Sequence, residues 1–134
     1  MFKKRVDSDR GPELANLLAA DRTDIAATLF VAAFGPIVDD PYPSRTGARL
    51  SEALAEVGGI EVGAWAWSSN RQPFASMARL VLELVLRWEQ SGLACRGLLQ
   101  EVNEVVLLER GADLIRSGGT AGVRDALTAI ETAD

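Results

Sequence analysis

The sequence contains no histidine and a single cysteine, Cys95, among its 134 residues. Histidine is the commonest general base and the commonest zinc ligand, and haem and iron–sulfur centres also depend on His or Cys ligands. These two absences exclude a Ser-His-Asp or Cys-His catalytic arrangement and an intrachain disulfide. We therefore expect no zinc, haem or iron–sulfur site built from this chain alone, and a disulfide-stapled secreted scaffold is excluded.

Long apolar runs and glycine-rich phosphate-binding patterns are also lacking. The longest uncharged stretch, residues 25–38, has fourteen residues, fewer than the roughly twenty that a helix needs to cross a bilayer. The basic start at residues 3–5 is followed by acidic residues, whereas a secretory signal would continue with an apolar stretch. Neither a P-loop nor a dinucleotide-binding glycine pattern is present. We expect a cytoplasmic protein without a membrane span.

The composition is typical of one globular domain. Hydrophobic residues make up 48% and charged residues 25% of the chain, which is close to the globular average. The net charge of −5 weighs against a chain-wide nucleic-acid surface. We expect a flexible N-terminal arm over residues 1–10 and a single helical domain over residues 11–134. The expected partner is another protein or a second copy of the chain, with no nucleic acid, no membrane and no cofactor.

Apolar residues recur at helical spacing along most of the chain, with glycines and prolines between the periodic segments. The fold class predicted is all-α, a compact bundle of five to six helices. Helices are expected over residues 12–20, 23–34, 46–57, 73–90, 93–108 and from 120 onward. Residues 60–67 are the exception, because their alternation is typical of a short irregular or extended segment.

Residues 73–90 form the strongest predicted helix, with one narrow polar stripe and apolar residues around most of its circumference. Such a helix lies at the centre of a bundle or at an interface. We expect it to carry more apolar surface than its own bundle can cover. The resulting hypothesis is a non-catalytic protein–protein interaction or regulatory module that self-associates into a homo-oligomer. Its candidate interaction residues are Trp65, Trp67, Phe74, Met77, Val81, Leu84 and Trp88.

Carboxylates three residues apart support an enzymatic alternative. Glu101 and Glu104 are expected on one exposed helix face, and Glu131 and Asp134 repeat the spacing at the C-terminus. Hard cations such as Mg²⁺ prefer carboxylate oxygens. The spacing resembles that of the all-α nucleoside triphosphate pyrophosphohydrolases, although Gln100 stands where that family usually carries a further glutamate. The resemblance implies a magnesium-dependent hydrolase with these four carboxylates as metal ligands and Glu101 and Glu104 as catalytic residues. A solvated helix surface gives the same spacing.

Three aromatic residues support a second alternative. If Trp65 and Trp67 lie on one face of an extended segment, with Phe74 nearby, they line a pocket for a small apolar ligand. Ordinary core packing of both indoles is the competing interpretation.

The stretch 35–47 is predicted to be a stiff loop, because it contains three prolines. It carries Asp39 and Asp40, with Arg45 and Arg49 nearby. Binding residues favour such loops, but the same residues can serve as turn caps and intramolecular ion pairs.

Overall fold

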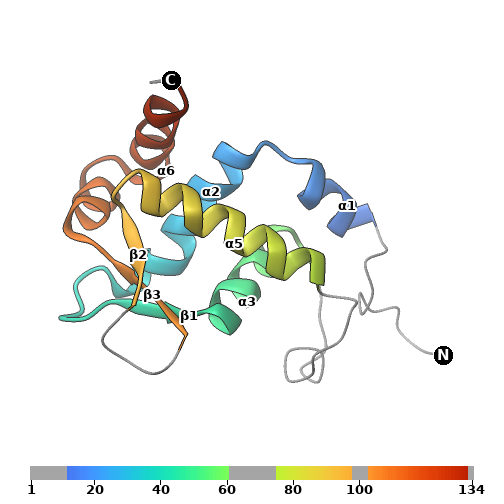
Figure 1. Ribbon diagram of the computed structural model, residues 1–134, viewed down its shortest axis with the longest axis horizontal. Helices are drawn as coiled ribbons and strands as arrows, with labels where there is room; N and C mark the ends of the chain where they lie inside the picture. Colours follow the sequence, from blue (N-terminus) through green and yellow to red (C-terminus); the bar gives the residue numbers. More distant parts are fainter. Residues whose placement is uncertain (1–11, 61–74, 98–102, 133–134) are drawn as a thin grey trace.

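The computed structural model describes residues 12–60, 75–97 and 103–132 (Figure 1). These residues form helices with a small three-stranded sheet. The elements are α1 (Pro12–Ala19), α2 (Arg22–Phe34), the short 3₁₀ helix η1 (Gly35–Ile37), β1 (Ser44–Thr46), α3 (Gly47–Val57), α5 (Ala75–Gln90), β2 (Ala94–Arg96), β3 (Glu104–Leu107) and α6 (Glu109–Thr132). The mostly helical character predicted from the sequence is confirmed. The bundle of five to six helices is not.

Local signals place the first helices within one or two residues of their predicted bounds. The Asp21 side chain accepts a hydrogen bond from the backbone N–H of Asp24 and caps α2, while Thr46 caps α3 through the N–H of Arg49. Gly59 follows α3 with φ of +70°, a conformation that favours glycine. Four of the predicted helices therefore correspond to α1, α2, α3 and α5.

The helix predicted over residues 93–108 is wrong. Within this stretch β2 and β3 pair antiparallel, with Cys95 opposite Val106, and β3 also pairs with β1, with Arg45 opposite Val105. The sheet order is β1-β3-β2, so β3 is the central strand. Adjacent β-branched valines pack well on a pleated surface, and the strand that completes the sheet lies some sixty positions earlier in the chain.

An aromatic cluster joins α5 to α2 in the core. The Trp88 ring lies 5.2 Å from the ring of Phe30 and 5.9 Å from that of Phe34, in edge-on arrangements. All three side chains are fully buried. The indole Nε1 donates a hydrogen bond of 3.0 Å to the Ala26 carbonyl. In Figure 1, α5 crosses in front of α2, which also packs against α6. The core therefore centres on α2.

The last helix bends at Gly119, where φ is +58° and ψ is −146°. The sequence predicts a break at this glycine pair and a final helix docked by Val123, Leu127 and Ile130. Val123 and Leu127 are buried as expected, and the side chain of Ile130 lies outside the described part of the chain.

Other sequence expectations fall outside the described residues. The expected N-terminal arm, residues 1–10, lies there, as does all but the first residue of the expected extended segment 60–67. That first residue, Ile60, is buried in the core. In the ranges that the structure describes, no helix combines the length and apolar character needed to cross a bilayer.

Candidate functional site

The predicted interaction residues of α5 lie in the core. The four that the structure describes are at most 5% exposed. They are Met77, Val81, Leu84 and Trp88. The other three, Trp65, Trp67 and Phe74, lie outside the described residues, so the apolar-ligand pocket that they would line is not described either. Because buried side chains cannot contact a partner while the domain stays folded, this inward side of α5 is core.

The opposite side of α5 carries two exposed leucines. Leu82 is 57% and Leu86 is 47% exposed, and they lie one helical turn apart. Of the α5 residues with described side chains, five are exposed, and we call them the outer face of α5: Ala78, Arg79, Leu82, Leu86 and Gln90. The sequence pattern did not single out these leucines, because the helix is apolar around most of its circumference and the pattern does not show which arc faces the core. The stripe and the leucines occupy neighbouring arcs of the helix.

Ion pairs border this outer face. Glu83 accepts a hydrogen bond of 3.1 Å from Arg22 Nε on α2. Glu89 accepts hydrogen bonds from the backbone N–H of Arg96, at 3.0 Å, and from its Nε, at 3.2 Å. Burial raises the pKa of Glu89, but the backbone and side-chain hydrogen bonds and the charge of Arg96 together hold that pKa below its usual range. Glu89 is therefore anchored as a carboxylate at the C-terminal end of α5.

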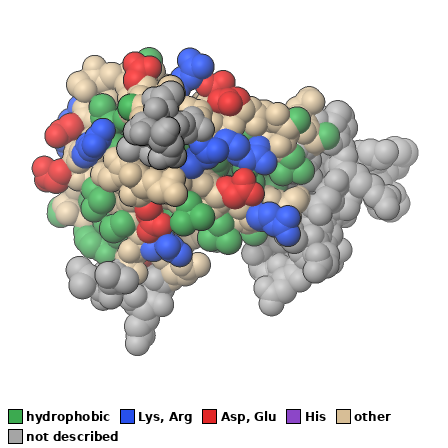
Figure 2. All heavy atoms as spheres, turned by 45° about the horizontal axis from the view of Figure 1, so that its top comes forward, with side chains coloured by type: hydrophobic (Ala, Val, Ile, Leu, Met, Phe, Trp, Pro, Cys, Tyr) green, Lys and Arg blue, Asp and Glu red, His purple; other side chains and the backbone are tan. Residues whose placement is uncertain are grey.

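On the face drawn in Figure 2, basic and acidic side chains are interspersed, with hydrophobic side chains between them. This distribution and the net charge of −5 differ from the continuous basic patch that typically binds nucleic acid.

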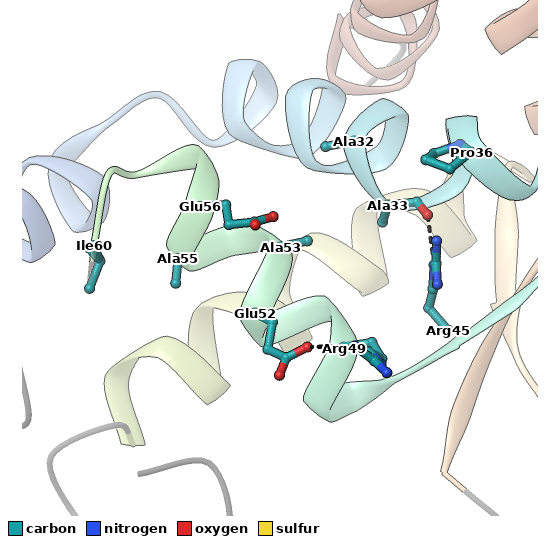
Figure 3. A pocket seen from close by; sticks show the side chains of 10 residues that line it. All are labelled: Ala32, Ala33, Pro36, Arg45, Arg49, Glu52, Ala53, Ala55, Glu56 and Ile60. Carbon is teal, nitrogen blue, oxygen red and sulfur yellow. Dashed lines mark hydrogen bonds and ion pairs between the residues drawn. The ribbon is translucent and has the colours of Figure 1, made fainter. Parts of the chain in front are cut away.

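A pocket of about 550 Å³ opens between α2, η1, β1 and α3 (Figure 3). Alanines and a few larger apolar side chains form its walls, and two arginines and two glutamates supply its charge. The lining residues are Ala32, Ala33, Pro36, Arg45, Arg49, Glu52, Ala53, Ala55, Glu56 and Ile60. The volume lies within the range of small-molecule sites.

The pocket contains part of the predicted binding loop. Arg45 Nε donates a hydrogen bond of 2.8 Å to the Ala33 carbonyl, and Arg49 forms an ion pair of 3.1 Å with Glu52. Asp39 lies elsewhere, where it pairs with Arg116 of α6 at 2.9 Å. The structure therefore brings the two predicted arginines to one site and directs Asp39 to a structural ion pair.

The predicted magnesium ligands do not share an exposed helix face. Glu104 lies in the central strand β3, is 5% exposed, and accepts a hydrogen bond of 2.6 Å from the Tyr42 hydroxyl. That hydrogen bond, with desolvation and the carboxylate charge, raises the pKa of Tyr42. The structure does not describe Glu101, Asp134 or the side chain of Glu131. Across the described ranges, no three metal-ligating side chains form a group able to hold an ion.

Comparisons with known proteins identify no relative. No family model, no curated protein and no solved structure matches the chain.

Proposed function

We propose that the chain is a non-catalytic interaction module that self-associates through the outer face of α5. The observation that supports this proposal is the exposure of Leu82 and Leu86 at the middle of a helix whose other described large apolar side chains are buried. Burying a leucine side chain contributes about 1.5–3 kcal/mol relative to leaving it in water. Contiguous exposed apolar patches mark docking surfaces, and we take the two leucines, one helical turn apart, as the centre of such a patch.

The pattern along α5 favours a second copy of the chain as the partner. Leu82 and Leu86 lie two positions on either side of residue 84, and Arg79 and Glu89 lie five positions on either side. If two α5 helices cross antiparallel about residue 84, each Leu82 meets Leu86 of the partner subunit. Each Arg79 then lies near Glu89 of the partner subunit, a carboxylate that also accepts hydrogen bonds from Arg96 of its own chain. Such a self-complementary patch is what a two-fold interface requires.

The size of the patch predicts a weak dimer. Stable interfaces bury about 800 Å² on each partner, and two leucines with their neighbours supply only part of that area. Weak interfaces of this kind lie at the low end of the range for specific complexes. We expect a dissociation constant on the order of 10 µM.

The test is light scattering after gel filtration, from 1 to 200 µM protein. The variant Leu82→Gln/Leu86→Gln removes the apolar centre of the patch, and Val57→Gln, at an exposed position on α3, is the matched control. We expect the wild type and the control to dimerise with rising concentration and the double variant to remain monomeric. A wild type that stays monomeric throughout contradicts the proposal, as does a double variant that dimerises equally well.

The order of the described elements favours a second candidate, nucleic-acid binding. A helix, a strand and two further helices, followed by a hairpin whose second strand is central, resemble the connectivity of winged helix-turn-helix domains. In helix-turn-helix proteins the second helix of the pair enters the major groove. Here α5 holds that position and presents Arg79 outward. The exposed leucines and the acidic net charge rank this candidate below self-association.

Fluorescence anisotropy separates the two candidates. A labelled 30-base-pair duplex is titrated with protein in low salt, because phosphate contacts weaken as salt rises. Binding at micromolar protein that Arg79→Ala weakens at least fivefold would support nucleic-acid recognition. An unchanged anisotropy would reject it.

A further inference from the structure

The charges of α3 are arranged against its own dipole. The N-terminal end of a helix carries partial positive charge and its C-terminal end partial negative charge, so acids stabilise the first turn and bases the last. In α3 the first turn holds Arg49 and no acid, and the last turn holds Glu56 and no base. This unfavourable placement of charges in α3 favours a role in binding, because residues that conflict with local structural preferences are common at functional sites.

The pocket beside α3 has a positive end and a negative end. Figure 3 shows Arg45 at one end and Glu56 toward the other, with alanine side chains between them. Arg49 and Glu52 are paired with each other, so their charges largely cancel. The remaining charges are those of Arg45 and Glu56. The dipole of α3 has the same direction as this pair and strengthens the polarity of the pocket.

Arg45 is held in place while keeping donors for a ligand. Its Nε is used in the hydrogen bond to the Ala33 carbonyl, which fixes the plane of the guanidinium. Its two terminal amino groups have no partner among the residues that the structure describes, and they can bind a carboxylate in the bidentate manner typical of arginine. Glu56 is exposed and, within the same described ranges, forms no hydrogen bond or ion pair through its carboxylate.

We propose that this pocket binds a small zwitterion, namely a short peptide with free termini, with its carboxylate at Arg45 and its ammonium at Glu56. Arg45 and Glu56 both line the pocket, so a ligand whose two ends carry opposite charges can contact both residues. An extended peptide of two to three residues with free termini is such a ligand, and it spans roughly 7–11 Å. The small alanine side chains leave room for its body, and the pocket volume of about 550 Å³ is sufficient. This inference does not depend on self-association through α5.

Isothermal titration calorimetry with Ala-Ala-Ala as the probe tests the proposal. We expect a dissociation constant on the order of 100 µM. Acetylating the amino end, or amidating the carboxyl end, removes one charge of the ligand and should weaken binding at least tenfold. Absence of a heat signal at millimolar tripeptide, or equal binding of the doubly capped peptide, overturns the proposal.

Substitutions then test the two ends of the pocket. Glu56→Gln should weaken binding of the free tripeptide at least tenfold, while the acetylated peptide, which lacks the ammonium, should lose little further affinity. Glu109→Gln, at an exposed position on α6 outside the pocket, is the matched control and should bind as the wild type does. Since Arg45 also bonds to the Ala33 carbonyl, Arg45→Lys is used with a check of its unfolding midpoint. If either pocket variant folds and binds like the wild type, the proposed pose is wrong.

Discussion

Trp88 connects α5 to α2 by packing and by a hydrogen bond. Its ring packs edge-on against two phenylalanines of α2, and its Nε1 donates to the Ala26 carbonyl. A buried indole needs such an acceptor, because an unpaired N–H in the core costs free energy. One residue therefore fixes both the depth and the rotation of α5 against α2.

Trp88→Phe keeps an aromatic ring but leaves the Ala26 carbonyl without this donor. We expect the free energy of unfolding to fall by about 1–3 kcal/mol, measured by urea denaturation. Leu82→Ala, on the exposed side of the same helix, should change it by less than about 0.5 kcal/mol at monomeric concentration. Equal losses in the two variants would contradict the assignment of inner and outer sides of α5.

Gly111 is required by close packing at the start of α6. A Cβ at this position would lie 2.3 Å from the Leu93 carbonyl oxygen and 2.7 Å from the Phe30 ring. We expect Gly111→Ala to lower the free energy of unfolding by about 1–3 kcal/mol, because the backbone at Leu93 must move to make room for the added methyl group. At Gly118 nothing lies within 4 Å of an added Cβ, so Gly118→Ala is the control and should be neutral or stabilising in thermal melts.

Glu89 makes stability depend on pH. Its pKa in the folded protein is lower than in the unfolded chain, so its contribution is present above the unfolded pKa and is lost as pH falls through the folded pKa. Urea midpoints measured from pH 7 to pH 3 should therefore fall less steeply for Glu89→Gln than for the wild type. Parallel curves for the two proteins would show that the Glu89–Arg96 ion pair does not cause the pH dependence of stability.

Among the secondary-structure elements, the sequence predicted those whose bounds are determined by local signals. Helix caps and glycine stops define α2 and α3, and the apolar periodicity of α5 is strong. The hairpin was missed because β3 gains its stability from β1, far away in sequence, and no local pattern records that pairing.

The candidate sites could also be predicted only in part. The sequence pointed to the arginines of the pocket. It did not point to Leu82 and Leu86, because periodicity alone does not show which arc of a nearly apolar helix meets the core.

The dipole of α3 allows a prediction of how Glu56 affects the free energy of unfolding of the unliganded protein. Removing the Glu56 carboxylate takes a negative charge away from the negative end of the helix. We expect Glu56→Gln to leave the free energy of unfolding unchanged or to raise it by up to about 0.5 kcal/mol. Urea denaturation without peptide measures this change. A clear loss of stability would mean that Glu56 serves the fold, and that the unfavourable placement has another cause.

In the part of the chain that the structure describes, most large apolar side chains are buried by neighbours from the same chain. The sequence hypothesis expected the apolar excess of α5 to lie on residues that the structure places in the core. Among the described residues, the large apolar side chains that stay exposed are those of Tyr42, Val57, Leu82 and Leu86, and the two leucines lie one turn apart on the outer face of α5. Self-association is therefore proposed as a weak, concentration-dependent property of a chain whose described part has its own buried core.

Sedimentation velocity across a concentration series measures self-association of the chain. The proposal predicts a species near the 14.4 kDa chain mass at 1 µM and a shift toward twice that mass by 200 µM. Glutamine at Leu82 and Leu86 should abolish the shift. A wild-type protein that sediments at the chain mass over the whole series would contradict self-association through the outer face of α5.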